Sequence, residues 1–118
     1  MHTVIETAWF ICAAAKAGMS ADEREAVVTT IARDPMAGES LGHGYRKLRV
    51  AGRSQGKRGG FRVITFFSEP DFPAFLITVF GKGEKASLTA AEMNELKTLA
   101  ETLVEGLADT AKKTGRRR

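Results

Sequence analysis

The sequence is poor in the residues on which many enzyme and metal sites depend, because its 118 residues include one cysteine, two histidines and one tyrosine. Cys12 has no second cysteine with which to form a disulfide, and its apolar surroundings between Trp9 and Ala15 predict a buried, unreactive thiol. His2 and His43 lie far apart, and no cluster of residues has the spacing of metal ligands. We therefore expect a protein that uses no metal and no other cofactor.

Other familiar signatures are also missing. No histidine stands beside a serine or cysteine that could serve as a nucleophile, and the stretch of residues 56–58 lacks the serine or threonine that ends a P-loop. The apolar run of residues 9–15 is too short to span a bilayer, and it lacks the basic start and cleavage context of a secretory signal. The expected location is the cytoplasm, with no membrane partner.

Positive charge is concentrated in the middle of the chain. Residues 37–85 hold nine lysines and arginines against four acidic residues, a net +5, whereas residues 1–36 come to −2 and residues 86–118 to +1. Such uneven charge favours an anionic partner. With 43% hydrophobic residues the chain can build one core, so we expect a single domain over residues 1–108 and a basic, disordered tail over 109–118.

The first third of the chain predicts a short strand and a helical hairpin. Residues 3–7 alternate weakly and are rich in β-branched side chains, which favours a strand. Trp9–Ala17 suits a buried helix that ends at Gly18. Ser20, followed three residues later by a glutamate, has the form of a capping box, so a second helix should run over residues 21–33.

Three further strands and a last helix are predicted later in the chain. Residues 45–50, 61–67 and 75–80 have strand-forming side chains, and their short connections favour antiparallel pairing. Thr89, with a glutamate three residues later, begins a helix whose apolar stripe should pack on the sheet. The predicted fold class is α+β: a small antiparallel sheet of the short N-terminal strand and these three strands, with an N-terminal helical hairpin and a C-terminal helix.

The phase of the strands brings cations together. Successive side chains of a strand alternate between faces, so Lys47 and Arg49 share one face and Arg46 lies on the other. Arg62, on the next strand, shares its face with apolar residues. That setting fits either an arginine at the sheet edge with an exposed head group or an arginine that binds a phosphate.

This basic set suits the cleavage of RNA. The ribose 2′-hydroxyl attacks the adjacent phosphorus, so the site must take a proton, stabilise extra negative charge and protonate the leaving oxygen. Arginines and lysines stabilise the charge directly, and Lys47, with arginines close by in the sequence, is predicted to exchange protons as well. Lys82 and Lys85 follow the last strand, where Gly81 and Gly83 let a ligand approach the backbone.

A family resemblance rests on the combined order and spacing of three motifs: residues 45–50, the glycine-rich basic stretch 56–64 and residues 76–85. The opening 4–7 and the closing helix from Leu88 match the same pattern. Together they resemble the RelE/HigB toxins of bacterial toxin–antitoxin modules, over residues 3–105. The resemblance implies a small sheet flanked by helices and cleavage of messenger RNA, usually on the translating ribosome. It also implies inhibition by a cognate antitoxin, often a helix-turn-helix protein.

The resemblance also implies roles for single residues. Lys47 and Arg49 match positions that act on the 2′-hydroxyl and the phosphate, and Arg62 matches an arginine that stabilises the scissile phosphate. The complete predicted catalytic set is Lys47, Arg49, Arg62, Lys82 and Lys85. The residues predicted to bind RNA are Arg46, Arg53, Lys57, Arg58 and Phe80.

Two features depart from the family pattern. Many relatives have a tyrosine where this chain has Phe80, and the only tyrosine here is Tyr45, so Phe80 offers ring stacking but no phenol. The glycine-rich approach to the strand is shortened around residues 42–44, and His43 is either a substitute acid or a loop histidine.

These departures leave two alternatives to the nuclease. One is a non-catalytic member of the same superfamily that inhibits by binding, with a gyrase-type target, or an inactive toxin remnant. The missing tyrosine favours it, whereas the cations favour a nuclease. A plain RNA-binding module is disfavoured because the aromatic residues suit a core.

Overall fold

The structure is a computed structural model that describes residues 2–51, 60–81, 89–96, 98, 99 and 101–103. By its internal contacts the chain divides into two compact units, Met1–Ala86 and Ser87–Arg118. The predicted domain end at residue 108 and the predicted tail at 109–118 lie outside the described residues.

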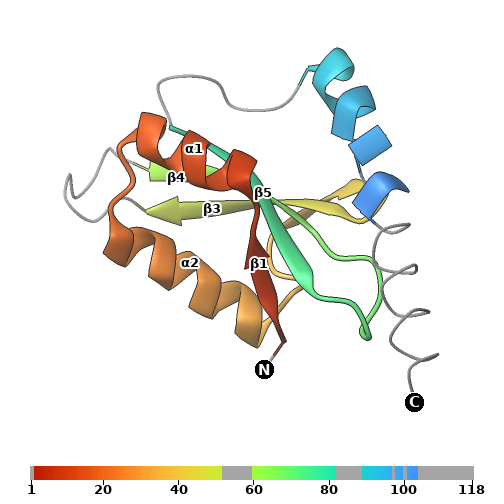
Figure 1. The fold of residues 1–118 in the computed structure, drawn as a ribbon, viewed down its shortest axis with the longest axis horizontal. Helices are drawn as coiled ribbons and strands as arrows, with labels where there is room; N and C mark the ends of the chain where they lie inside the picture. The colour runs from red at the N-terminus through yellow and green to blue at the C-terminus, as the bar shows by residue number, and fades with distance from the viewer. Residues whose placement is uncertain (1, 52–59, 82–88, 97, 100, 104–118) are drawn as a thin grey trace. The chain divides into compact units, whose positions relative to one another are not determined.

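The first predicted helix forms with the expected ends (Figure 1). α1 (Ala8–Ala17) begins after Thr7, whose hydroxyl accepts a hydrogen bond from the Phe10 amide at 3.2 Å, and it ends at Gly18 with φ 81°. The same Thr7 hydroxyl donates to the Leu76 carbonyl at 2.8 Å. The cap therefore also ties the start of α1 to the sheet.

The second predicted helix begins at its capping box. α2 (Ala21–Arg33) follows Ser20, whose amide donates to Glu23 Oε1 at 2.8 Å while the Glu23 amide donates to Ser20 Oγ at 3.1 Å. Arg24 Nε lies 3.0 Å from a carboxylate oxygen of Glu6 and links α2 to the first strand. A local sequence signal thus sets the start of α2.

Five strands form one sheet: β1 (Val4–Glu6), β2 (Glu39–Gly42), β3 (Tyr45–Ala51), β4 (Gly60–Phe66) and β5 (Ala74–Gly81). Their spatial order is β1-β5-β4-β3-β2, and the three pairs β2–β3, β3–β4 and β4–β5 are antiparallel. The α+β class is confirmed, while the sheet differs from the prediction in two respects.

The first difference is that the sheet is mixed, because β1 pairs with β5 in parallel, with Val4 opposite Ala74. Parallel neighbours need a long connection, and here the whole chain between the two strands supplies it. The second difference is β2, a fifth strand at the far edge. Its residues Glu-Ser-Leu-Gly have weak strand preference, so the sequence of this segment does not predict a strand.

A tight turn joins β2 to β3, and the two strands pair antiparallel. His43 has φ 57° and Gly44 has φ 88°, the pair of positive values that a type I′ hairpin turn uses. Gly42 lies opposite Tyr45 across the turn. His43 therefore stands at the tip of a hairpin.

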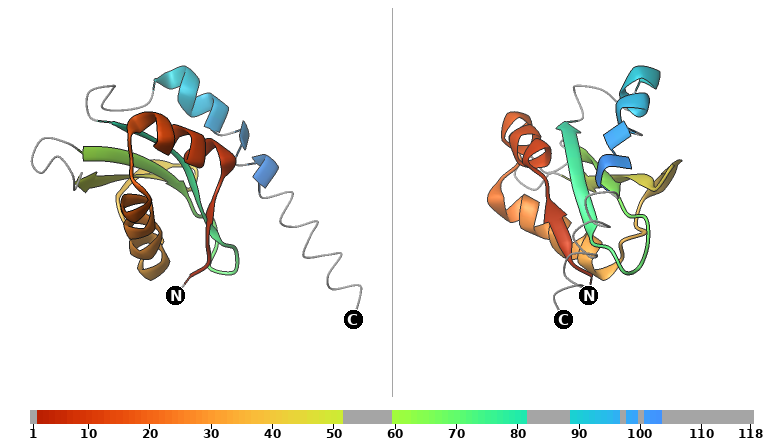
Figure 2. Two further views of the ribbon diagram at one scale, coloured as in Figure 1. Left: turned by 60° about the vertical axis from the view of Figure 1, so that its left-hand side comes forward. Right: turned by 45° about the vertical axis from the view of Figure 1, so that its right-hand side comes forward.

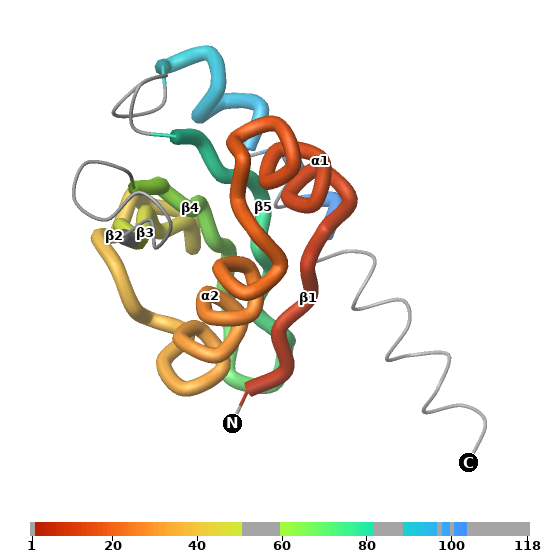
Figure 3. Tube along the Cα trace, turned by 90° about the vertical axis from the view of Figure 1, so that its left-hand side faces the viewer, coloured from red at the N-terminus to blue at the C-terminus, as the bar shows by residue number. Residues whose placement is uncertain are grey.

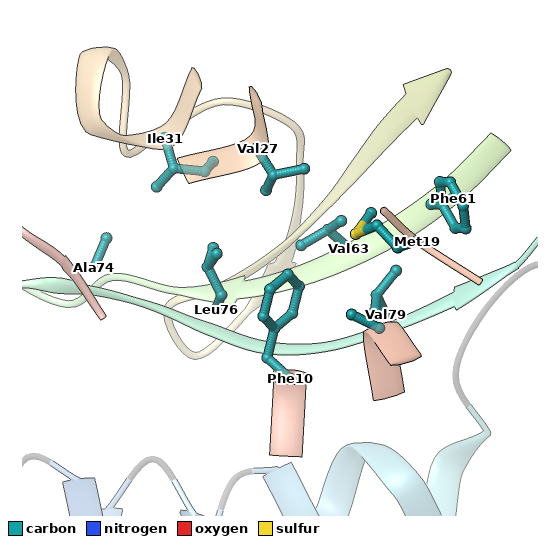
Figure 4. Packing of buried hydrophobic residues seen from close by; sticks show 10 residues of the cluster. Phe10, Met19, Val27, Ile31, Phe61, Val63, Ala74, Leu76 and Val79 are labelled. Atoms are coloured by element: carbon teal, nitrogen blue, oxygen red, sulfur yellow. The ribbon is translucent and has the colours of Figure 1, made fainter. Parts of the chain in front are cut away.

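The core lies between the helices and one face of the sheet, and both helices lie on that face in Figures 2 and 3. Its buried side chains, most of them labelled in Figure 4, are Phe10, Ala14, Met19, Val27, Ile31, Phe61, Val63, Ala74, Leu76 and Val79. Phe10 and Ile31 are fully buried, and a side chain of this size contributes about 1.5–3 kcal/mol on burial.

The prediction of a buried thiol is wrong, because Cys12 is exposed. Phe10 and Ala14 face the sheet and are buried, so the helical period turns Cys12 towards the opposite side of α1. The apolar run continues around the helix, and Trp9 is 53% and Ile11 42% exposed. A continuous apolar run does not reveal which side of a helix is covered.

The other face of the sheet is aromatic at one end of β3 and β4 and carries cations further along. At one end Tyr45 lies opposite Phe66, with ring centroids 5.0 Å apart, and Phe66 lies opposite Phe75. All three rings are buried. Two residues further along β3, Lys47 lies opposite the buried Ile64, and the cations begin there.

In the second unit the predicted capping box is confirmed. The Glu92 amide donates to Thr89 Oγ1 at 3.1 Å, and the Thr89 amide donates to Glu92 Oε1 at 2.9 Å. The described residues from 90 to 103 are helical. The apolar side chains at 93, 96, 99 and 103 are partly buried and amphipathically spaced, while packing of this stripe on the sheet stays a prediction.

Within the described ranges no helix has the length and apolarity needed to cross a bilayer.

Candidate active site

Two arginines predicted to be catalytic face each other on adjacent strands. Arg49 of β3 lies directly opposite Arg62 of β4, and Lys47 lies two residues from Arg49 on the same face. Directly opposed residues in an antiparallel pair have Cβ atoms only about 4.5–5.5 Å apart. The structure therefore brings together the three predicted cations of the strands, on the face turned away from α1 and α2.

Like charges in directly opposed positions destabilise a sheet. The pair is therefore not explained by the stability of the sheet. Two guanidinium groups side by side can each bind a phosphate with two parallel hydrogen bonds, which would remove the repulsion. The arrangement suits an anion between Arg49 and Arg62.

A cavity of about 470 Å³ lies at these residues. It is lined by Gly38, Glu39, Lys47, Leu48, Arg49 and Arg62, and this set is called the cation cavity below. Arg49 is exposed, while Lys47 and Arg62 are half-buried. The volume lies within the range of ordinary ligand pockets, and the cavity reaches from the β2 edge to β4.

Gly38 allows the two sides of the cation cavity to come close. Its φ is +99°, and a Cβ at this position would lie 2.6 Å from the carbonyl oxygen of Lys47. The chain can therefore pass directly over β3 before β2 begins. As a result Glu39, the first residue of β2, lies opposite Lys47 in the register.

Sequence reasoning missed Glu39 as a candidate residue. Its position depends on β2, which has little strand character of its own. The available signal was the Gly-His-Gly run before Tyr45, which is typical of a two-residue hairpin turn. That turn alone would set Ser40 opposite Lys47, and Glu39 takes this place because the register shifts by one residue between Ser40 and Gly42.

Arg46 is placed differently from the other strand cations. It lies on the opposite face from Lys47 and Arg49, does not line the cation cavity, and its Nη1 donates to the Gly38 carbonyl at 2.9 Å. This hydrogen bond holds the segment before β2 against β3. A role for Arg46 in binding RNA stays a prediction.

Phe80 lies opposite Arg62 on β5, beside the cations, but it is only 5% exposed. Stacking of a base on its ring stays a prediction, and it would require the ring to be uncovered. The other predicted residues, Lys82 and Lys85 of the catalytic set and Arg53, Lys57 and Arg58 of the RNA-binding set, lie outside the described residues.

Neither Tyr45 nor His43 lines the cation cavity. Tyr45 is fully buried, and burial raises the pKa of its phenol from 10.0 to about 12. A phenol held neutral and covered is a poor proton carrier. His43 is exposed at the hairpin tip and does not line the cation cavity, which favours the loop interpretation.

A family model described as the RelE toxin of the RelE/RelB toxin–antitoxin system matches residues 2–115. The chain belongs to this RelE family. It is therefore a toxin of a toxin–antitoxin system with a cognate antitoxin as its partner. The match spans both units and confirms the family that the motifs at residues 45–50, 56–64 and 76–85 predicted.

Proposed function

We propose that this RelE-family toxin is an endoribonuclease that cuts messenger RNA without a metal ion and thereby inhibits translation. The observation that supports the proposal is the pair of opposed arginines, Arg49 and Arg62, with Lys47 on the same face of a cavity of about 470 Å³. The ribosome is the proposed site of action, and a helix-turn-helix antitoxin is the proposed inhibitor.

Each cation has a task in this reaction. Arg49 and Arg62 hold the non-bridging oxygens of the scissile phosphate and stabilise the charge that builds up as the 2′-oxygen attacks. Lys47 exchanges a proton with the reacting oxygens. Lys82 and Lys85, from the stretch after β5, are proposed to add positive charge at the same phosphate.

The RNA on either side of the cut would be held by charge. Arg53, Lys57 and Arg58 belong to the basic stretch between β3 and β4, the two strands that carry the opposed arginines. Contacts of lysine and arginine with phosphates release counterions, so binding should weaken steeply as salt rises. Arg46 and Phe80 are proposed as further contacts.

A second candidate function is inhibition by binding, without cleavage, of a gyrase-type target. It is favoured by the state of the single tyrosine, because Tyr45 is buried and its pKa is raised to about 12. Under this alternative the cations of the cavity would bind an acidic surface or a nucleic acid and leave it intact.

The deciding experiment incubates the purified protein with ribosomes programmed with messenger RNA and maps the ends of the product. Wild-type protein that has been treated with EDTA and then separated from it should cut as fast as untreated protein, and Arg62→Ala should cut at least a hundredfold more slowly. Arg33→Ala is the matched control, because Arg33 is exposed at the end of α2 and does not line the cavity. Intact RNA together with inhibited gyrase supercoiling would favour the second function.

A further inference from the structure

Among the described residues that line the cation cavity, Glu39 alone carries a carboxylate. It lies opposite Lys47 across the β2–β3 pair. Glu39 is exposed, and within the described part of the chain its side chain has no hydrogen bond or ion pair. The carboxylate is therefore available to a ligand in the cavity.

The chemistry of the cleavage needs a group of this kind. A charged lysine or arginine has only hydrogen-bond donors, so it can hold a phosphate or give up a proton but cannot take one. The attack of the 2′-hydroxyl requires an acceptor for its proton. Among the side chains that line the cation cavity, the carboxylate of Glu39 is the one that accepts in its charged form.

We propose that Glu39 is the general base of this toxin and Lys47 the general acid, an inference that rests on the proposed nuclease function. The O–H bond of the 2′-hydroxyl breaks and its proton goes to Glu39 while the 2′-oxygen bonds to phosphorus. The bond from phosphorus to the 5′-oxygen breaks, and Lys47 gives that oxygen a proton. The products are a 2′,3′-cyclic phosphate and a 5′-hydroxyl, and proton exchange with water restores both residues.

The backbone holds the base in position. Gly38, the neighbour of Glu39, passes so close to the Lys47 carbonyl that a Cβ there would lie 2.6 Å from it. Arg46 donates to the Gly38 carbonyl at 2.9 Å from the other face. Arg46 is thus a positioning residue, because its hydrogen bond fixes the start of β2 from which Glu39 extends.

The first test compares Glu39→Gln with Glu25→Gln in the full chain. Glu25 is exposed on α2, so its variant makes the same charge change away from the cavity and should cut like the wild type. Glu39→Gln should cut about 10²- to 10⁴-fold more slowly, and the acidic side of the pH–rate profile should flatten. Its affinity for an uncleavable RNA with a 2′-deoxyribose at the cut should stay equal or rise, because a negative charge has left a cationic cavity. A rate equal to the wild type, or a loss fully accounted for by weaker binding, would overturn the proposal.

The second test separates the base from the acid. At a cleavage site mapped with the wild-type protein, the leaving 5′-oxygen of the RNA is replaced by sulfur, which leaves as a thiolate without being protonated. Lys47→Met should then recover most of its lost rate, and Glu39→Gln should remain slow. Recovery by Glu39→Gln alone would reverse the two roles. A wild-type protein that cuts no RNA would defeat the nuclease function together with this inference, whereas fast cutting by Glu39→Gln would defeat only the inference.

Discussion

Arg49 of β3 and Arg62 of β4 form a directly opposed cross-strand pair of like charges. Such a pair destabilises a sheet, so replacing one member by an uncharged residue should stabilise the protein. Arg49→Gln should raise the free energy of unfolding by up to about 1 kcal/mol. The same change should weaken binding of RNA, because one of the two phosphate ligands is lost.

Urea unfolding with and without inorganic phosphate checks this prediction. An anion site between the two arginines predicts that phosphate stabilises the folded wild type more than it stabilises Arg49→Gln. Arg33→Gln, an exposed change at the end of α2, should respond to phosphate like the wild type. Equal stabilisation of all three proteins would argue against an anion site at this pair.

Two buried threonines should respond in opposite directions to the same substitution. Thr65 is 0% exposed, and its Oγ1 has no hydrogen-bond partner among the described residues. A buried hydroxyl without a partner carries a desolvation cost of about 1–3 kcal/mol, so Thr65→Val should stabilise the protein by about 1 kcal/mol. Thr7→Val should destabilise it by about 1–2 kcal/mol, since the Thr7 hydroxyl caps α1 and donates to the Leu76 carbonyl at 2.8 Å. Thermal or urea unfolding in which both variants shift the same way would contradict this account.

The elements that could be predicted are those whose signals are local. The capping boxes at Ser20 and Thr89 require only residues three apart, and both form as predicted. Strand phase also requires only neighbouring residues, so the shared face of Lys47 and Arg49 was accessible from the sequence. Arg49 and Arg62 lie on two consecutive strands, and a short connection between consecutive strands favours their antiparallel pairing.

The features that could not be predicted depend on distant contacts. β2 is a strand because the hairpin turn pairs it with β3, and Glu39 enters the cavity only through that pairing. The parallel pairing of β1 with β5 joins segments at opposite ends of the unit. The exposure of Cys12 depends on which side of α1 packs on the sheet. Because the apolar residues lie on all sides of this helix, the sequence does not indicate which side is buried.

The single tyrosine offers a direct measure of packing at the aromatic end of the sheet. Burial raises the pKa of Tyr45 from 10.0 to about 12, so the folded state keeps a proton that the unfolded state loses between these pH values. Stability should be unaffected below about pH 10 and should fall between pH 10 and 12, by roughly 2 kcal/mol in all. The ultraviolet absorbance of tyrosinate reports one residue only, and Tyr45→Phe should remove both the titration and this part of the pH dependence. A titration midpoint near 10 in the folded protein would show that the phenol is not buried.

Substitutions at Gly38 and Gly42 distinguish the cost of a strained dihedral angle from the cost of a steric clash. Both have positive φ, at +99° and +90°, but a Cβ at Gly38 would lie 2.6 Å from the Lys47 carbonyl whereas a Cβ at Gly42 would have nothing within 4 Å. Gly42→Ala should therefore cost about 1 kcal/mol of stability from its dihedral angle alone. Gly38→Ala should cost roughly 2–4 kcal/mol, since the contact with a backbone atom adds to that strain. It should also move Glu39 away from Lys47, so cleavage by the protein that remains folded should fall for Gly38→Ala and not for Gly42→Ala. Equal losses of stability and activity in the two variants would mean that the close approach to Lys47 does not shape the cation cavity.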